Sequence, residues 1–245
     1  MTLRAAPIFS DHMVLQRGKE TPIWGTADDG ERIEAEIAGR RAVTMAAGGT
    51  WRLKLPAAEA GGPHTLVIRS ASVTLEFRDV WYGDVWLAGG QSNMEWPLAE
   101  SAGGEAEIAA SGDYPLIRYY DVPKAAHDDG IERESRWRVS GPESAGSFSA
   151  AAYHFAKKIQ PVLGVPIGII GCNMGATSAS CWVSEETLER DAGLRVYLDE
   201  FRALTENFDW AAYEEAERAF QEAFRAWQEG EAQGKTKEEL GPVPW

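Results

Sequence analysis

Cysteine and histidine are scarce in this sequence, and their scarcity excludes several kinds of site. Only Cys172 and Cys181 occur, which is too few for a disulfide framework. They form no C-x-x-C pair, and the four histidines are not clustered as the ligands of a zinc site would be. We therefore expect a protein of a reducing compartment, the cytoplasm, that uses no metal and no other cofactor.

The chain also lacks a block of basic residues and a long apolar run. Lys and Arg number 24 against 38 Asp and Glu, so the formal net charge is −14 and nucleic acid is not an expected partner. No apolar stretch approaches the roughly 20 residues that span a bilayer. The N-terminal stretch has no uninterrupted apolar segment of signal-peptide length. No membrane partner is expected either.

Two apolar patterns are present, and they divide the chain near residue 80. Before that point, segments such as "ERIEAEI" and "TWRLKLP" alternate apolar with polar residues and are separated by the turn signals "DDG" and "AGGP". In "ERIEAEI" this alternation places Ile33, Ala35 and Ile37 on one face of a strand that is solvated on the other. We predict an antiparallel β-sandwich-like domain over residues 1–82.

After residue 80 the strands are short continuous apolar runs, "DVWLAG", "LIRYYD" and "PIGIIG". Such runs are typical of a parallel sheet that helices cover on both faces. A helix is expected between the last two runs, with Ser147 or Ser149 as its N-cap, Pro161 ending or kinking it, and Gly164 turning the chain into the next strand. The apolar positions of this helix are Phe148, Ala152, Phe155 and Ile159.

A second, longer helix is predicted over residues 209–229. Aromatic residues recur on one of its faces, while acids and arginines occupy the other. Because such an apolar face has to be buried against something, we expect it to pack on this chain's own domain or on a missing C-terminal segment of the same enzyme. The aromatic residues are Trp210, Tyr213, Phe220, Phe224 and Trp227.

Ser92 lies in "LAGGQSNMEW", directly after a buried strand that ends at Gly89 and Gly90. The carboxyl ends of parallel strands are where open α/β sheets carry their ligand sites, so a nucleophilic serine fits this place. A lone Gly-x-Ser is also common in turns, and the spacing by itself leaves that alternative open. The stretch is not the Gly-x-Ser-x-Gly elbow of α/β-hydrolases, because Met94 stands where the second glycine belongs.

Three blocks of the sequence resemble one family. "GDVWLAGGQSNMEWPL" is similar to the nucleophile block of the sialate O-acetylesterase-like, carbohydrate acetylesterase branch of the SGNH hydrolases. "FSDHMVLQRGKETPIWG" resembles the start of that family's N-terminal β-domain, and "GVPIGIIGCNMGATSASCW" resembles its second block. The resemblance covers residues 7 to about 190. It implies an α/β fold in which residues 83–245 are part of a flavodoxin-like three-layer α/β/α SGNH hydrolase domain, incomplete in this chain, with a helical insertion from about residue 184.

The resemblance also implies the roles of site residues. Ser92 is the implied nucleophile, and the backbone N–H groups of Ser92 and Gly175 are the implied oxyanion hole. The second block departs from the family's Gly-Gly-Thr because Ala176 follows Gly175. The oxyanion role survives this change unless the backbone at Ala176 needs a positive φ. The residues expected to line the pocket are Gln91, Asn93, Trp96, Asn173 and Trp182.

A catalytic base is missing from the expected place. A serine hydroxyl needs a histidine to accept its proton and a carboxylate to orient the imidazole, and the family supplies both from an Asp-x-x-His near its C-terminus. No histidine here has an aspartate three residues before it; the residues at those positions are Phe9, Gly61, Lys124 and Ala151. We expect the chain to be the front part of a longer enzyme. His127, in a polar loop, is the substitute base if there is one.

Three functions remain open at this point. The first, which we favour, is a serine esterase that removes O-acetyl groups from sugars and is completed by a C-terminal fragment of the same enzyme. The second is a carbohydrate-binding protein without a catalytic base, and the third is a structural assembly module whose acidic helices dock a partner. A homo-oligomer is compatible with all three. The sequence does not distinguish acetylated sialic acid from acetylated xylan as the substrate.

Overall fold

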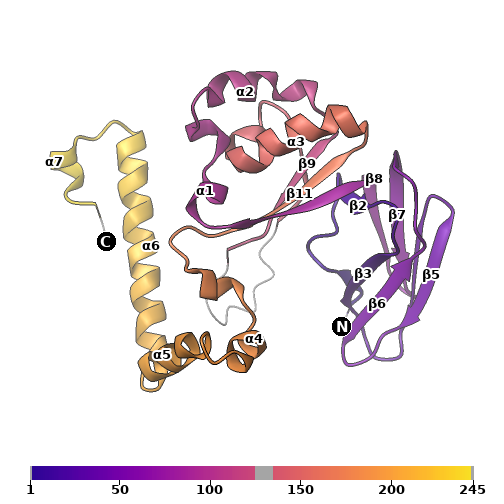
Figure 1. Cartoon of the computed structure of the whole chain (residues 1–245), viewed down its shortest axis with the longest axis horizontal. Coiled ribbons are helices and arrows are strands. Elements are labelled where there is room, and N and C mark those ends of the chain that lie inside the picture. Colours follow the sequence, from indigo (N-terminus) through magenta and orange to yellow (C-terminus); the bar gives the residue numbers. More distant parts are fainter. Residues whose placement is uncertain (1, 125–134, 244–245) are drawn as a thin grey trace. The chain divides into compact units, whose positions relative to one another are not determined.

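The computed structural model describes residues 2–124 and 135–243 of the chain. The chain divides into two compact units, Met1–Thr177 and Ser178–Trp245 (Figure 1). The first unit contains every strand of the described residues, and the second is built from helices. The expected mixed α/β class is confirmed.

The strands of the first unit form two sheets. A three-stranded antiparallel sheet has the order β1-β3-β6, and a larger sheet has the order β10-β9-β11-β8-β7-β4-β5, with β2 also paired to β8. The strands in chain order are β1 (Arg4–Ala5), β2 (Val14–Gln16), β3 (Thr21–Thr26), β4 (Arg32–Ile37), β5 (Arg40–Met45), β6 (Thr50–Leu55), β7 (Gly61–Arg69), β8 (Thr74–Gly90), β9 (Ile117–Asp121), β10 (Arg138–Val139) and β11 (Ile167–Asn173).

The alternating pattern before residue 80 is confirmed as antiparallel strands. On β4, Ile33, Ala35 and Ile37 are buried in the core, as their spacing predicts. Glu34 was expected to face solvent, but it is buried as well. The reason is tertiary: the guanidinium groups of Arg32 and Arg41 both bind its carboxylate and cover it.

Strand β8 connects the two parts of the first unit. Its first half pairs antiparallel with β7, and Trp81 to Gly83 pair in parallel with β2. From Asp84 to Gly90 it pairs in parallel with β11. The partners therefore change at Gly83, next to the boundary predicted between residues 82 and 83, although the strand itself runs through without a break. The division into domains at that boundary stays a prediction.

The three apolar runs form the predicted parallel group, with β11 between β9 and β8. Successive residues of β9 enter different cores: Tyr119 is buried on the side of the helices, and Tyr120 is buried beside Trp137 with the N-terminal strands. Among the described residues of the first unit, helices cover one face of these strands and the N-terminal strands cover the other, so the expected cover by helices on both faces stays a prediction. An apolar run indicates that both faces of a strand are covered, without indicating which elements cover them. The cover is also incomplete, because Leu87 near the end of β8 is 71% exposed.

The helices of the first unit pack into one core on one side of these strands. They are α1 (Ser92–Glu95), α2 (Gly104–Ala110) and α3 (Ala150–Leu163). Helix α3 lies between β9 and β11 in the chain and completes a crossover connection.

Helix α3 confirms most of what its sequence predicts. The Ser149 side chain caps it by accepting the N–H of Ala152, and Gly164 ends it with a left-handed φ of +65°. Pro161 does not end the helix, because it lies in the last turn and the helix continues to Leu163. Phe155, on the predicted apolar face, is 39% exposed and contacts the ring of Trp86 edge to face.

The second unit contains α4 (Glu185–Arg190), α5 (Arg195–Thr205), α6 (Trp210–Ala232) and α7 (Lys237–Leu240). Helix α6 matches the long helix predicted over residues 209–229, and Asp209 caps it by accepting the N–H of Ala212. Its aromatic residues remain partly exposed, with Tyr213 at 48%. Among the described residues, no helix is both long enough and apolar enough to cross a bilayer.

Candidate active site around Ser92

Ser92 begins helix α1, immediately beyond the carboxyl end of β8. Gln91 is the N-cap residue, and the N–H groups of Met94 and Glu95 bond back to its carbonyl oxygen. The N–H of Ser92 itself lies in the first turn, where a helix has no internal acceptor for it. Gly90, with φ of +146°, lets the chain leave the strand and turn sharply into the helix. The serine hydroxyl is thus presented at the end of the sheet, as the sequence predicted.

Gly175 lies next to Ser92 because their two strands end side by side. Asn173, the last residue of β11, is in register with Gly90, and the N–H of Met174 donates to the Gly90 carbonyl at 3.0 Å. A Cβ placed on Gly175 would lie 3.5 Å from the Oγ of Ser92 and 2.5 Å from the Oε2 of Glu95. A side chain at position 175 would therefore require the flexible Glu95 side chain to move away from the Gly175 N–H.

The positive φ in this loop belongs to Ala176, whose φ is +61°. This is the conformation for which the family's second glycine is suited, and an alanine there carries a steric cost of roughly 1 kcal/mol or more. The backbone at Gly175 itself lies outside that region. The departure from Gly-Gly-Thr therefore strains the residue that follows Gly175, which is the condition under which the sequence puts the oxyanion role of this loop in question, and that role stays a prediction.

Glu95 is a site residue that the sequence analysis missed. Its carboxylate accepts the N–H of Gly175, the group assigned to the oxyanion hole, and forms an ion pair with Lys124. The spacing could have indicated it, because Glu95 follows Ser92 by one helical turn and residues at i and i+3 share a face. A bound ester carbonyl and the Glu95 carboxylate would compete for the same N–H donor.

The remaining predicted pocket residues separate into four groups. Gln91 and Asn93 are exposed beside Ser92, and the Oγ of Ser92 donates to the Oε1 of Gln91 at 3.2 Å. Trp96 directly follows α1 and is 51% exposed, so its ring is free to form a wall. Asn173 contacts the hydroxyl of Tyr119, whose burial raises its pKa to about 12. Trp182 belongs to the second unit, in a short 3-10 helix.

No histidine is brought to Ser92 among the described residues. The Nδ1 of His12 lies 2.7 Å from the Oδ2 of Asp79, a histidine–carboxylate pair near the other end of β8. Eleven residues separate Asp79 from Gly90 along β8, which is on the order of 30 Å in an extended strand. His64 lies on β7 and His154 on α3. His127, the predicted substitute base, lies outside the described residues.

The place of the Asp79 carboxylate is explained by the fold, in which it pairs with a buried cation. Besides His12 it binds Arg118 at 2.9 Å and the indole N–H of Trp81 at 2.7 Å. Although desolvation raises its pKa, these partners together lower the pKa of Asp79 below its usual value. Arg118 is itself buried, so the carboxylate neutralises a cation that the fold has removed from water.

Cysteine and acidic residues do not assemble into a metal site. Among the residues that the structure describes, no group of three or more His, Cys, Asp or Glu side chains could hold a metal ion. Cys172 and Cys181 are both free thiols. The chemistry available around Ser92 is that of a hydroxyl, backbone N–H donors, and the charged pair Glu95 and Lys124.

The chain is similar to esterases that act on acetylated sugars. No protein-family model matches it. It is 27% identical to the sialate O-acetylesterase of Rattus norvegicus over 207 residues, which covers 76% of this chain and 38% of the rat protein. It is 26% identical to the sialate O-acetylesterase of Homo sapiens, again over 76% of this chain and 40% of that protein.

A solved structure agrees with these relatives. The crystal structure of a carbohydrate acetylesterase from Xanthomonas citri is 37% identical to the chain, with a TM-score of 0.71 over 78% of this chain and 44% of that one. The chain therefore spans 38% to 44% of the length of these relatives. The family resemblance stated from the motifs is confirmed.

Proposed function

We propose that this chain, a member of the sialate O-acetylesterase-like family of carbohydrate acetylesterases, is the nucleophile-bearing part of a serine esterase that removes O-acetyl groups from sugars. The observation that carries the proposal is the adjacency of Ser92 and Gly175 at the ends of β8 and β11. A hydroxyl and two backbone N–H donors that meet at one edge of a sheet are the parts that acyl transfer requires.

In the proposed reaction, the Oγ of Ser92 forms a bond to the acetyl carbon while a base takes its proton. The carbonyl electrons move to the oxygen, which the N–H groups of Ser92 and Gly175 stabilise. The sugar alkoxide then leaves and takes a proton from the protonated base, so that an acetyl-serine and a free sugar hydroxyl result. Water, deprotonated by the same base, attacks the acetyl-serine, and acetate departs as the hydroxyl of Ser92 is restored.

We assign the base and its orienting carboxylate to a C-terminal segment that carries Asp-x-x-His. Two observations support this assignment: none of the histidines that the structure describes bonds to Ser92, and the relatives are more than twice as long as the aligned part of this chain.

The same proposal includes the finer fold. Residues 1–82 form the sandwich-like domain, and residues 83–245 form part of a flavodoxin-like, three-layer SGNH hydrolase domain. The parallel order β9-β11-β8 with the α3 crossover supports it.

Replacement of Ser92 tests the proposal. The variant Ser92→Ala, in this chain combined with a segment carrying Asp-x-x-His, is expected to lose hydrolysis of 4-nitrophenyl acetate by at least about a thousandfold. Ser72→Ala, an exposed serine in the turn between β7 and β8, is the matched control and should retain full activity. A Ser92→Ala variant that keeps most of the rate would remove Ser92 from the mechanism.

A further inference from the structure

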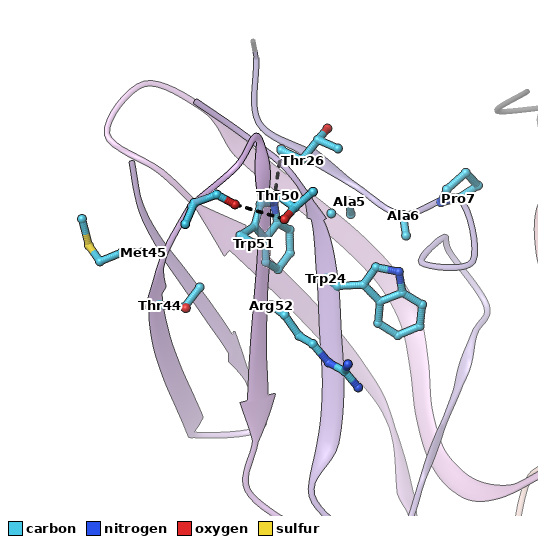
Figure 2. Close-up of a pocket in the computed structure, with 12 residues that line it drawn as sticks. Ala5, Ala6, Pro7, Trp24, Thr26, Thr44, Met45, Thr50, Trp51 and Arg52 are labelled. Atoms are coloured by element: carbon cyan, nitrogen blue, oxygen red, sulfur yellow. Dashed lines mark hydrogen bonds between the residues drawn. The ribbon is translucent and has the colours of Figure 1, made fainter. Parts of the chain in front are cut away.

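A pocket lies in the N-terminal strands of the first unit. Its volume is about 670 Å³, and it opens between β3, β5 and β6 beside residues 5–7 (Figure 2). None of the described residues that line it is Asp or Glu, although the chain has 38 of them. The polar groups in the pocket are the guanidinium of Arg52 and three threonine hydroxyls. The proposed esterase function does not use this pocket.

Trp24 and Arg52 stand side by side in this pocket. They form a directly opposed pair in the antiparallel register of β3 and β6. The neighbouring pair, Ile23 and Leu53, is buried in the core, so the alternation of strands turns Trp24 and Arg52 to the outer face. Figure 2 shows the indole of Trp24 and the side chain of Arg52 extending from adjacent strands on this face.

The ring of Trp24 is held in place before any ligand arrives. The buried ring of Phe9 contacts it edge to face, with 4.7 Å between the centroids. Trp24 nevertheless remains 39% exposed. An aromatic ring that is fixed and yet open to solvent loses little conformational freedom when a ligand packs on it.

The guanidinium of Arg52 has no ion pair and no hydrogen bond in the part of the chain that the structure describes, whereas several other exposed cations of these strands have an ion-pair partner. Lys54, on the same face of β6, pairs with Glu20, and Arg69 pairs with Glu36. In a chain of net charge −14, an unpaired guanidinium in a pocket without carboxylates attracts an anion. The hydroxyls of Thr26 and Thr44 border the same space and have no side-chain hydrogen bond among the described residues.

We propose that this pocket binds an acidic saccharide. The apolar C–H face of one sugar ring packs on Trp24, the sugar carboxylate pairs with Arg52, and ring hydroxyls bond to Thr26 and Thr44. The aromatic ring supplies apolar contact area, and the planar guanidinium matches a carboxylate in two parallel hydrogen bonds. A neutral sugar satisfies only the first and last of these contacts and therefore binds more weakly.

Calorimetric titration of the full chain carrying Ser92→Ala, co-expressed with a segment carrying Asp-x-x-His that keeps it soluble, tests the inference apart from the esterase proposal, because binding is read without turnover. Two matched pairs of probes are used: 3′-sialyllactose with lactose, and a glucuronic acid-substituted xylotriose with xylotriose. We expect at least one acidic probe to bind about tenfold more tightly than its neutral partner, and the pair that shows the difference identifies the source of the carboxylate.

Variants separate the two contacts. Arg52→Gln should remove the preference for the acidic probe, while Lys54→Gln, the matched control on the same face, should leave it unchanged. Trp24→Ala should lower the affinity for both probes about tenfold, and Trp24→Tyr should recover most of the lost affinity. Arg52→Gln changes an exposed side chain, so it reports on binding even if Trp24→Ala fails to fold.

Three outcomes would overturn the inference. Equal affinity for acidic and neutral probes removes the role of Arg52. If Lys54→Gln and Arg52→Gln lose the same affinity for the acidic probe, the attraction comes from the positive charge of this face in general and not from a specific site. Dimerisation of the chain that Trp24→Ala abolishes means that the pocket is a contact between copies. A failure of Ser92→Ala to abolish esterase activity would leave all of these measurements intact, so the two proposals fail separately.

Discussion

At the scale of single residues, the contact between Glu95 and Gly175 sets which donors near Ser92 are available to a ligand. The carboxylate occupies the N–H that the oxyanion would need, and Lys124 balances its charge. The side chain of Glu95 ends in the same group as acetate, the product of the proposed reaction. If the proposed reaction takes place here, the Glu95 carboxylate is an internal analogue of its product, and the substrate would have to displace it.

Removal of this carboxylate should open the site to acetate. We expect Glu95→Ala to bind acetate about tenfold more tightly than the unmodified chain, because one charge-assisted hydrogen bond no longer competes and one negative charge is gone. Titration of the chain, co-expressed with a segment carrying Asp-x-x-His, with acetate measures this affinity through the amide resonance of Gly175 and without any catalysis. Glu100→Ala, an exposed acid in the turn after α1, is the control and should change nothing. Unchanged acetate affinity in Glu95→Ala would mean that the contact does not block the N–H.

Ala176 provides a test of backbone strain at the same loop. Its φ of +61° is a conformation that glycine adopts freely and alanine does not. We expect Ala176→Gly to raise the free energy of unfolding by about 1 kcal/mol, since the relief of strain exceeds the extra chain entropy of glycine. Thermal unfolding measures the change. A lower stability in this variant would show that the loop is relaxed with alanine.

At the scale of elements, β8 joins the antiparallel strands to the parallel group, and its midpoint is tightly constrained. Gly83 is the residue at which the partners change, and a Cβ there would lie 2.1 Å from the carbonyl oxygen of Pro166. Next to it, the guanidinium of Arg17 binds Asp84 at 2.8 Å and lowers the pKa of that carboxyl. The carboxyl end of the strand, where Ser92 lies, is positioned through this junction.

Substitution at the junction should therefore be costly. We expect Gly83→Ala to lower the free energy of unfolding by more than about 2 kcal/mol, because backbone has to move to admit the methyl group. Gly61→Ala is the matched control: Gly61 is paired with Tyr82, its φ is not positive, and a Cβ there meets no atom within 4 Å. The control should cost less than about 1 kcal/mol. Urea unfolding followed by tryptophan fluorescence distinguishes the two, and equal losses would contradict the role given to Gly83.

At the scale of the whole molecule, two apolar surfaces are left partly exposed and would be covered by additional protein. Leu87 at the end of β8 is 71% exposed, and the aromatic face of α6 is only partly covered, with Tyr213 at 48%. Exposed apolar area of this kind favours association. The C-terminal segment assigned above would also bring the imidazole that Ser92 requires.

We expect residues 1–245 by themselves to be poorly soluble or loosely packed, and to hydrolyse 4-nitrophenyl acetate no faster than the Ser92→Ala variant. Co-expression with a segment carrying Asp-x-x-His should restore both solubility and activity, since the base and the covering surface arrive together. Size-exclusion chromatography with an esterase assay measures both. A monodisperse chain that unfolds cooperatively and is active without the segment would place the base within this sequence and direct attention to His127.

The sequence by itself determined the elements and the position of the candidate nucleophile. The spacing of apolar residues predicted β4, the parallel runs, α3 and α6, because strand and helix periodicity depends on neighbours along the chain. The Gly-Gly-Gln-Ser-Asn-Met block likewise placed Ser92 at the end of β8. Only the tertiary structure decided which distant groups meet: Glu95 with the N–H of Gly175, 80 residues away, and Trp24 with Arg52 on neighbouring strands. Strand register and packing between remote segments create these contacts, and no local pattern contains that information.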